Sequence, residues 1–164
     1  MMTVHATETR TTTTTIPDAP FAAGPTALPY ARVQQFYAYQ TALLDELRVQ
    51  EFAATFTEDG VLTSAPTARP ARGRAAIAAA LSAAHERRFG TEPVRRRHWQ
   101  NALRVEELPD GSLLASYCTL VTVIRPWHPV AAIGPSAAVE DVLVVDGGEL
   151  RVRERRITPD HLSF

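Results

Sequence analysis

Two titratable side chains are the first candidates for acid–base chemistry. His98 opens a long run of β-type sequence about halfway along the chain, and Asp45 lies late in a helical pattern. On that helix Asp45 shares an edge with Ala38 and Thr41, away from the most polar face. A carboxylate can hold an imidazole in one tautomer, and the imidazole can then act as a general acid or base on a proton next to a carbonyl. Such a pair would suit enolisation, dehydration or ring closure.

Two more residues could take part in the same chemistry. Asp141 shares a predicted strand face with Val139 and Leu143, which implies a carboxylate among apolar neighbours. Burial raises the pKa of a carboxylic acid, so Asp141 is a second candidate base. Tyr117, on the neighbouring predicted strand, could donate a hydrogen bond to a developing enolate.

Structural roles remain open for all four residues. His98 could be a structural histidine or face solvent, and Tyr117 could serve only the core. The carboxylates could pair with nearby arginines, which are Arg48 for Asp45 and either Arg153 or Arg155 for Asp141.

Composition narrows the possible functions. The 164 residues, 45% of them hydrophobic, suffice for one buried core and indicate a single domain. A net charge of -1 gives no overall field for nucleic acid or an anionic membrane, so we expect neither partner. All 17 basic residues are arginine, which excludes a Schiff-base lysine from the mechanism.

We expect neither metal nor cofactor. No Cys/His cluster has zinc-ligand spacing, and no glycine-rich phosphate loop is present. The single cysteine, Cys118, lies in an apolar run and is expected to be a small buried hydrophobe. The sequence contains neither a secretory leader nor an apolar run of membrane-spanning length, so a cytoplasmic location is expected.

The first half of the chain reads as a tail followed by helices. Residues 1–25 are rich in threonine and proline and are expected to be disordered, whereas residues 26–164 form the predicted domain. Apolar residues at spacings of three and four predict helices over 30–47 and 50–57. A turn is expected at Glu58-Asp59-Gly60, then a strand from Val61, a loop, and a helix over 74–88.

Strand patterns fill the second half. They cover 94–108 and 112–125, joined by a hairpin turn, and then 137–146 and 149–157. Pro126 and Pro129 are expected to break the second strand, and a loop through Gly134 follows. Both faces of the second strand look covered. The order is α-α-β-α-β-β-β-β, an α+β arrangement with an antiparallel meander.

Three groups of residues, in this order, resemble the nuclear transport factor 2-like (NTF2-like) superfamily and its SnoaL-like group. They are Leu43-Leu44-Asp45-Glu46 with Phe52 to Val61, Arg97-His98 with Asn101, and Glu140-Asp141 to Gly148 with Arg155-Arg156. The resemblance covers residues 30–164. Three positions depart from the usual pattern, with Leu47 for a glycine or small residue, Val139 for tyrosine and Leu150 for tryptophan.

This resemblance implies a cone in which N-terminal helices pack in a strongly curved mixed or antiparallel sheet that encloses an apolar pocket. It often implies a homodimer packed through the sheets. Members include scytalone dehydratase, ketosteroid isomerase, limonene epoxide hydrolase, polyketide cyclases and the non-catalytic β subunits of dioxygenases. We therefore expect a cofactor-independent cyclase, isomerase or dehydratase for an apolar, carbonyl-bearing, polyketide-like intermediate of secondary metabolism. Two rival functions stay open, a non-catalytic binding or assembly subunit and an epoxide-opening enzyme.

The resemblance also assigns residues to the site. Asp45 and His98 match a pocket aspartate and a pocket histidine of scytalone dehydratase, while the polyketide cyclases use an aspartate in the late strands, where Asp141 lies. Substrate contacts are expected from four further side chains, which are Tyr37, Phe52, Asn101 and Trp127. A basic patch could hold a carboxylated or phosphorylated substrate or simply be a solvated face; its members are Arg87, Arg88, Arg95, Arg96 and Arg97.

Overall fold

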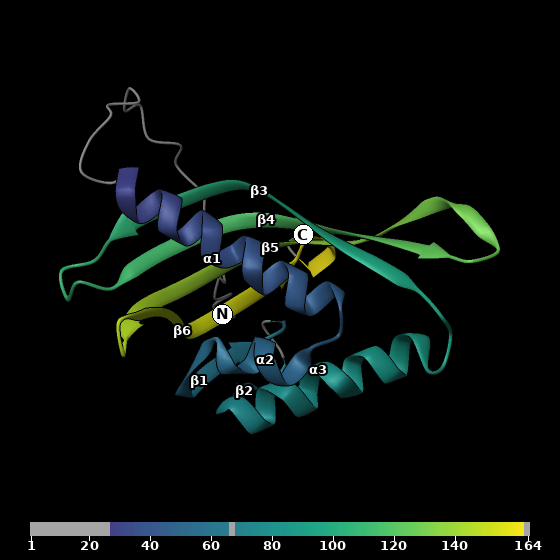
Figure 1. The fold of residues 1–164 in the computed structure, drawn as a ribbon, viewed down its shortest axis with the longest axis horizontal. Helices are drawn as coiled ribbons and strands as arrows, with labels where there is room; N and C mark the ends of the chain where they lie inside the picture. Colours follow the sequence, from purple (N-terminus) through teal and green to yellow (C-terminus); the bar gives the residue numbers. More distant parts are fainter. Residues whose placement is uncertain (1–26, 66–67, 163–164) are drawn as a thin grey trace, which may run out of the picture.

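The computed structural model describes residues 27–65 and 68–162. The predicted tail, residues 1–25, lies outside this part. Figure 1 shows the elements, which are α1 (Ala27–Asp45), α2 (Val49–Ala54), β1 (Phe56–Thr63), β2 (Ala71–Arg72), α3 (Arg74–Phe89), β3 (Arg95–Glu107), β4 (Leu113–Arg125), β5 (His128–Asp146), β6 (Glu149–Pro159) and the short 3-10 helix η1 (Asp160–Leu162).

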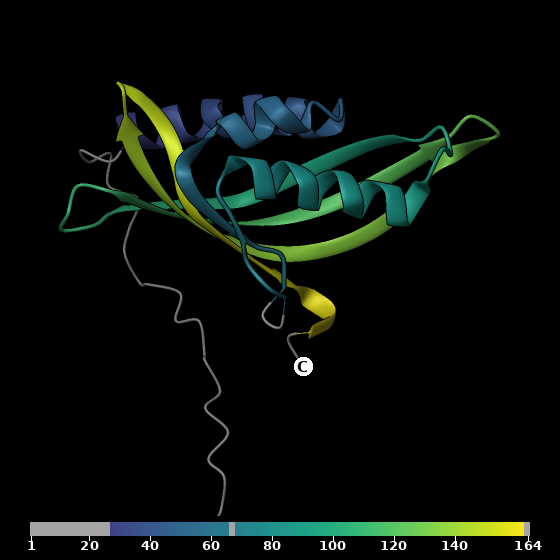
Figure 2. The same cartoon turned by 90° about the horizontal axis from the view of Figure 1, so that it is seen from below.

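The strands form one mixed sheet in the order β2-β1-β6-β5-β4-β3. The meander β3 to β6 is antiparallel, as predicted, while β1 pairs in parallel with β6. Figure 2 shows α1 and α3 on one side of β3 to β6. The predicted α+β fold with its N-terminal helices and mixed sheet is therefore confirmed, and the strong curvature of the sheet stays an expectation.

The core lies between the helices and the inner face of the sheet. Val33 and Leu43 of α1 are at most 1% exposed, and Ile77 of α3 is fully buried. They pack against inward-facing strand residues such as Leu143 and Val152, which are also fully buried. Each such side chain stabilises the fold by about 1.5–3 kcal/mol relative to an exposed one. This packing fixes α1 across the sheet and thereby fixes the position of Asp45.

Two predictions about β1 and its neighbour are wrong. Residues 58–60 do not form a turn but lie inside β1, whose pairing with β6 shifts register between Phe56 and Val61. The irregularity explains the turn-like composition, because bulged strands accept such residues. The strand β2 was missed because its two residues are too few for any periodicity.

The expected loop before residue 137 is also wrong. β5 begins at His128, which pairs with Arg125, and the hairpin continues through the pair Thr122 and Ile133. Register shifts on both sides of that pair let the strand contain prolines, which cannot donate ladder hydrogen bonds. On β4, Cys118 is exposed rather than buried, so the outer face of this strand is not fully covered as predicted.

Candidate functional site

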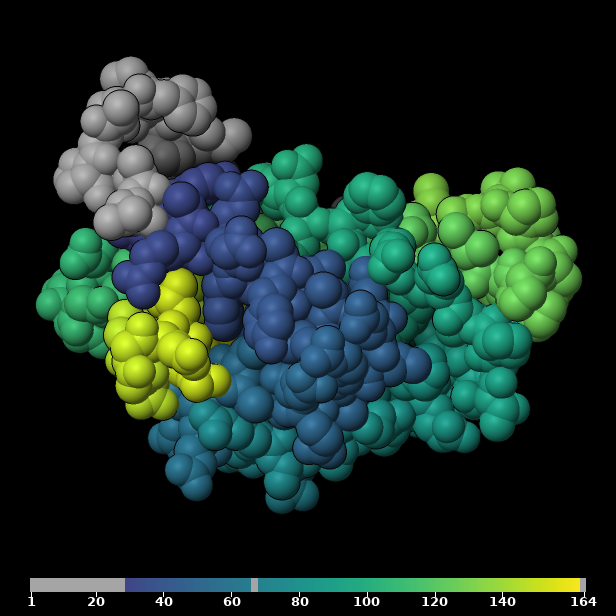
Figure 3. Space-filling model, viewed as in Figure 1, coloured from purple at the N-terminus to yellow at the C-terminus, as the bar shows by residue number. Residues whose placement is uncertain are grey.

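Two adjoining pockets lie between the helices and the sheet. The first, of about 430 Å³, is lined mainly by α1 and β3, and the second, of about 600 Å³, extends to α3, β5 and β6. Both volumes lie in the range of small-molecule sites. Figure 3 views the molecule from the helix side, with α1 across its middle. Four residues line both pockets, namely Thr41, His98, Gln100 and Tyr117.

His98 and Asp45 form a close pair at this shared wall. The ring Nδ1 of His98 lies 2.7 Å from Asp45 Oδ1, and the backbone N–H of His98 donates to the same oxygen at 3.1 Å. The side chains are only 14% and 5% exposed, respectively. Arg97 Nη1 lies 3.5 Å from the other carboxylate oxygen. The structure thus brings together the two residues that the sequence pointed to first.

The end of α1 sets the position of Asp45, the last residue of that helix. Leu47 N–H donates to Leu44 O at 3.3 Å and Arg48 N–H to Leu43 O at 2.9 Å, which is a Schellman motif. The motif turns the chain sharply after Asp45. A carboxylate at a helix C-terminus is disfavoured by the helix dipole, so the contacts from β3 must offset that cost.

The alternative pairing of Asp45 with Arg48 is wrong. The Arg48 guanidinium instead binds Glu51 at 2.5 Å and Glu46 at 3.4 Å. Arg48 is therefore occupied on the surface, and Asp45 is free to bind His98.

Leu47 has a φ of 59°, the left-handed conformation that glycine adopts without strain. This is the position where the SnoaL-like pattern usually has a glycine or small residue. We expect Leu47→Gly to exceed Leu47→Ala in unfolding free energy by about 1 kcal/mol, because both lose the side chain but only alanine keeps the strain. Urea denaturation of the two variants measures the difference, and a more stable alanine variant would contradict this view of the turn.

Burial lowers the pKa of His98, and the hydrogen bond and negative charge of Asp45 only partly offset this effect. His98 is therefore neutral near pH 7. A carboxylate only accepts hydrogen bonds, so Nδ1 carries the ring proton and Nε2 holds the free lone pair. An imidazole in this state can accept a proton from a ligand in the pockets.

Tyr117 lines both pockets from β4 and is 5% exposed. Its ring centroid lies 4.8 Å from that of Tyr37. Burial raises the pKa of Tyr117, with a further rise from the charge of Asp141 that opposes the lowering by Arg155. The phenol therefore keeps its proton at neutral pH and is a hydrogen-bond donor.

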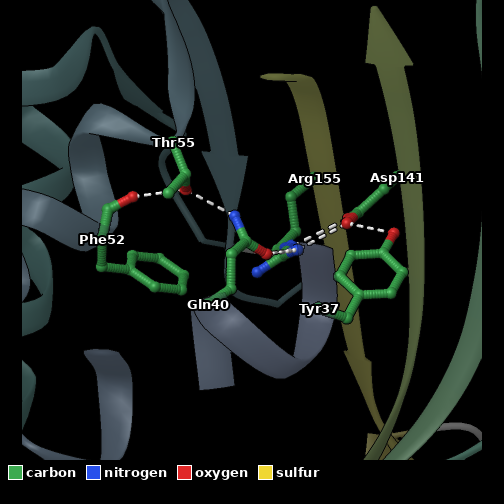
Figure 4. A network of polar contacts seen from close by, with 6 residues as sticks. All are labelled: Tyr37, Gln40, Phe52, Thr55, Asp141 and Arg155. Carbon is green, nitrogen blue, oxygen red and sulfur yellow. Dashed lines mark hydrogen bonds and ion pairs between the residues drawn. The ribbon is translucent and has the colours of Figure 1, made fainter. Parts of the chain in front are cut away.

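A second polar cluster is centred on Asp141 and Arg155 (Figure 4). Arg155 Nε donates to Asp141 Oδ1 at 2.8 Å and its Nη2 to Oδ2 at 2.5 Å. Tyr37 donates its hydroxyl proton to Oδ2 at 2.7 Å, and Arg155 Nη2 also reaches Gln40 Oε1 at 2.8 Å. All four residues are at most 5% exposed.

Both oxygens of Asp141 are thus held by strong donors, and the alternative pairing with Arg155 is the one the structure contains. Burial lowers the pKa of Arg155, but the charge of Asp141 and its hydrogen bond, together with Tyr117 and Tyr37, outweigh this and leave the pKa raised. Arg153, the other candidate, contacts Asp110 instead. Asp141 lines neither pocket, so its geometry favours a structural role over that of a reserve base.

Three of the four residues expected to contact substrate line a pocket, and one does not. Tyr37 and Asn101 line the first pocket, and Phe52 lines the second. Trp127 lines neither and is 65% exposed, because it occupies the turn between β4 and β5 far along the hairpin. The structure therefore does not place Trp127 at the site.

Gln40 was missed as a site residue. It interrupts the apolar stripe of α1, and a polar residue on such a stripe was the available signal. Its Nε2 donates to Thr55 Oγ1 at 2.5 Å while its Oε1 accepts from Arg155, so it links α1 to β6 and to the residue after α2. It also lines the second pocket.

Within residues 27–65 and 68–162, no three His, Cys, Asp or Glu side chains are grouped so that they could hold a metal ion. None of the helices described in this part of the chain has the length and apolar character needed to cross a membrane.

Three solved structures resemble the chain closely. A protein from Catenulispora acidiphila, in complex with S-DNPA, is 40% identical with a TM-score of 0.74, over 82% of this chain and 96% of that one. ActVI-ORFA from Streptomyces coelicolor is 38% identical with a TM-score of 0.77, over 82% and 99%. Aln2 from another Streptomyces strain is 36% identical with a TM-score of 0.77, over 84% and 95%.

No curated protein matches the chain. The family model of the SnoaL-like domain, in contrast, matches residues 25–156. This span contains α1 and the strands up to Arg156, and hence every candidate site residue named above. The chain belongs to the SnoaL-like domain family, with the NTF2-like fold.

Proposed function

We propose that the protein is a cofactor-independent acid–base enzyme, a cyclase, isomerase or dehydratase for an apolar, carbonyl-bearing, polyketide-like intermediate. The observation that carries this proposal is the buried pair of His98 and Asp45, 2.7 Å apart, at a wall shared by two pockets. The relative that is 40% identical, crystallised in complex with S-DNPA, supports binding of a comparable ligand here.

The proposed reaction begins when Nε2 of His98 removes a proton from the carbon next to the carbonyl. The electron pair of that C–H bond forms an enolate, which Tyr117 stabilises by hydrogen bonding to the developing oxyanion. Asp45 stabilises the imidazolium that results. His98 then returns the proton to another carbon in an isomerisation or to a departing hydroxyl in a dehydration, so protons and charge balance.

The two rival functions fit the geometry less well. A non-catalytic binding subunit predicts an interior filled by side chains, whereas two pockets remain open and His98 lines both. Asp45 lines neither pocket but contacts His98 directly from behind this wall. Epoxide opening would need Asp45 and Asp141 with an arginine in one pocket. Neither carboxylate is among the pocket-lining residues, and Arg155 is engaged by Asp141.

The outer face of the sheet supports a homodimer. Trp99 there is 60% exposed, with its indole N–H donating to Thr122 Oγ1 at 3.0 Å, and Ile124 is 37% exposed. Leu120 is the cross-strand partner of Trp99, and Cys118 on the same strand face is exposed. An apolar aromatic surface of this kind is typical of protein–protein contacts.

The proposal is tested with 2-tetralone, an apolar bicyclic ketone, as a surrogate substrate. We expect the protein to accelerate exchange of the proton next to the carbonyl in D₂O, followed by ¹H NMR. His98→Gln should abolish the acceleration, while His128→Gln, at an exposed histidine outside both pockets, should keep it. Equal rates for wild type and His98→Gln would refute the role of His98.

The rate of exchange should depend on pH through His98. Because burial lowers the pKa of His98 below its usual 6.5, the neutral base persists as pH falls, and kcat/KM should decline with a midpoint below pH 6.5. Asp45 raises this pKa, so Asp45→Asn should move the midpoint to still lower pH. Proton-exchange rates measured by ¹H NMR from about pH 4.5 to 8 give this profile. That pH range brackets the ordinary pKa of histidine. A midpoint above 6.5 would be inconsistent with a buried neutral base.

A further inference from the structure

Cationic side chains cluster along the second pocket, beside the apolar part. Arg87 and Arg88 come from the last turn of α3, and Arg96 comes from β3. The Arg96 guanidinium lies 5.9 Å from the ring centroid of Phe89, the last residue of α3, which joins the two elements. The basic patch is therefore not simply a solvated face, because Arg96 is half-buried and lines the second pocket.

These positive charges lack carboxylate partners within the part of the chain that the structure describes. Among residues 27–65 and 68–162, no salt bridge involves Arg87, Arg88 or Arg96, and Arg96 donates to the backbone oxygen of Leu44, at 3.0 Å. Burial and the charge of Arg88 lower the pKa of Arg96, against a rise from Asp45. Asp45 is already bonded to His98 and Arg97. A negative group that enters the pocket would reduce the repulsion between the positive charges of Arg88 and Arg96.

Arg96, the half-buried member of this arginine cluster, lies close to His98, the proposed base. Arg96 and His98 are two residues apart on β3, so they share a strand face with backbones about 7 Å apart. Both line the second pocket, whose lining surface is largely apolar, with Leu44, Leu81 and Val121 as examples. A ligand with an apolar body and one acidic group would meet apolar walls, arginines and base together.

We propose that Arg88 and Arg96 bind a carboxylate of the substrate, so that the natural substrate class is an apolar ring system carrying a short acidic side chain. This inference rests on the proposed function, because it names the substrate class of the same pocket. Arginine suits the role, since its planar guanidinium donates two parallel hydrogen bonds to a carboxylate. The pairing anchors the substrate while leaving its carbonyl region beside His98.

The test compares two probes that differ only in charge, 1-naphthaleneacetate and the neutral 1-naphthaleneacetamide, by isothermal titration calorimetry at pH 7. We expect wild type to bind the acid about tenfold or more tightly than the amide, as hydrogen bonds to charged groups commonly allow. Arg96→Gln should bring the two affinities within about threefold, with little change for the amide. Arg88→Gln should reduce the preference in the same direction.

Arg95→Gln is the matched control, because Arg95 is the neighbour of Arg96 on β3 but is exposed and lines neither pocket. It should keep the full preference for the acid. Equal affinities in wild type, no binding of the acid, or a preference that survives in both Arg88→Gln and Arg96→Gln would overturn the inference. The measurement involves no turnover, so an acid preference without proton exchange would refute the proposed function alone.

Discussion

Asp45→Asn is expected to slow proton exchange from 2-tetralone by about 10²- to 10⁴-fold, because replacing the aspartate that orients a catalytic histidine costs up to about 10⁴-fold. The imidazolium that forms during proton removal loses its negative neighbour in this variant. The asparagine NH₂ must also face either His98 or Arg97, and both positions are occupied by donors in the wild type. Initial rates by NMR at pH 7 measure the loss.

The matched control is Asp59→Asn, at an exposed aspartate of β1 outside both pockets, which should keep the wild-type rate. Affinity for 1-naphthaleneacetamide should stay within about threefold of wild type in Asp45→Asn, because a neutral probe does not depend on the imidazolium. A rate for Asp45→Asn close to that of Asp59→Asn would mean that the carboxylate does not assist His98.

Asp141→Asn is expected to lower the free energy of unfolding by about 3–5 kcal/mol, because it leaves the buried Arg155 guanidinium without its counter-charge. Arg155 cannot escape by losing its proton, because a guanidinium stays protonated in proteins. The asparagine NH₂ would also face a donor, either Tyr37 and Arg155 Nη2 at one position or Arg155 Nε at the other. Such a loss is a large fraction of the roughly 5–15 kcal/mol typical of a domain. Urea denaturation at pH 7 gives the change directly.

Glu154→Gln is the control for this second prediction. Glu154 lies next to Arg155 on β6 and pairs with Arg156. Both side chains of that pair are about half exposed, so the change should stay within about 0.5 kcal/mol. Replacing both members of the buried pair, in Asp141→Leu with Arg155→Met, should recover part of the loss. Asp141→Asn with wild-type stability would show that the buried pair is not needed for the fold.

Most of the fold could be predicted because its elements are periodic. The apolar stripe of α1 and the alternating residues of β3, β4 and β6 each bury one face, and such patterns are visible without tertiary information. Failures occurred where local composition and tertiary pairing disagree. Residues 58–60 look like a turn but belong to β1, and His128 to Pro135 look like a loop but pair with β4.

The site residues could be predicted where residue type and family pattern agreed. They were harder to predict where the direction of a side chain determines its partner. His98 and Asp45 were paired through their resemblance to known positions, and the Schellman turn at Leu47 explains how α1 presents Asp45 to β3. The preference of Asp141 for Arg155 over Arg153 depends on which strand face each occupies. Trp127 was misplaced because its hairpin extends beyond the pockets, a length that no local pattern indicates.

The most direct test of the account is the protonation state of His98, observed by ¹⁵N NMR of the histidine-labelled protein at pH 7 with His98→Gln for assignment. The geometry predicts a neutral ring with the proton on Nδ1, bonded to Asp45, and an unprotonated Nε2. In Asp45→Asn this preference for the Nδ1 proton should weaken. A ring that is cationic at pH 7, or that carries its proton on Nε2, would contradict the claim that Asp45 holds His98 as a base.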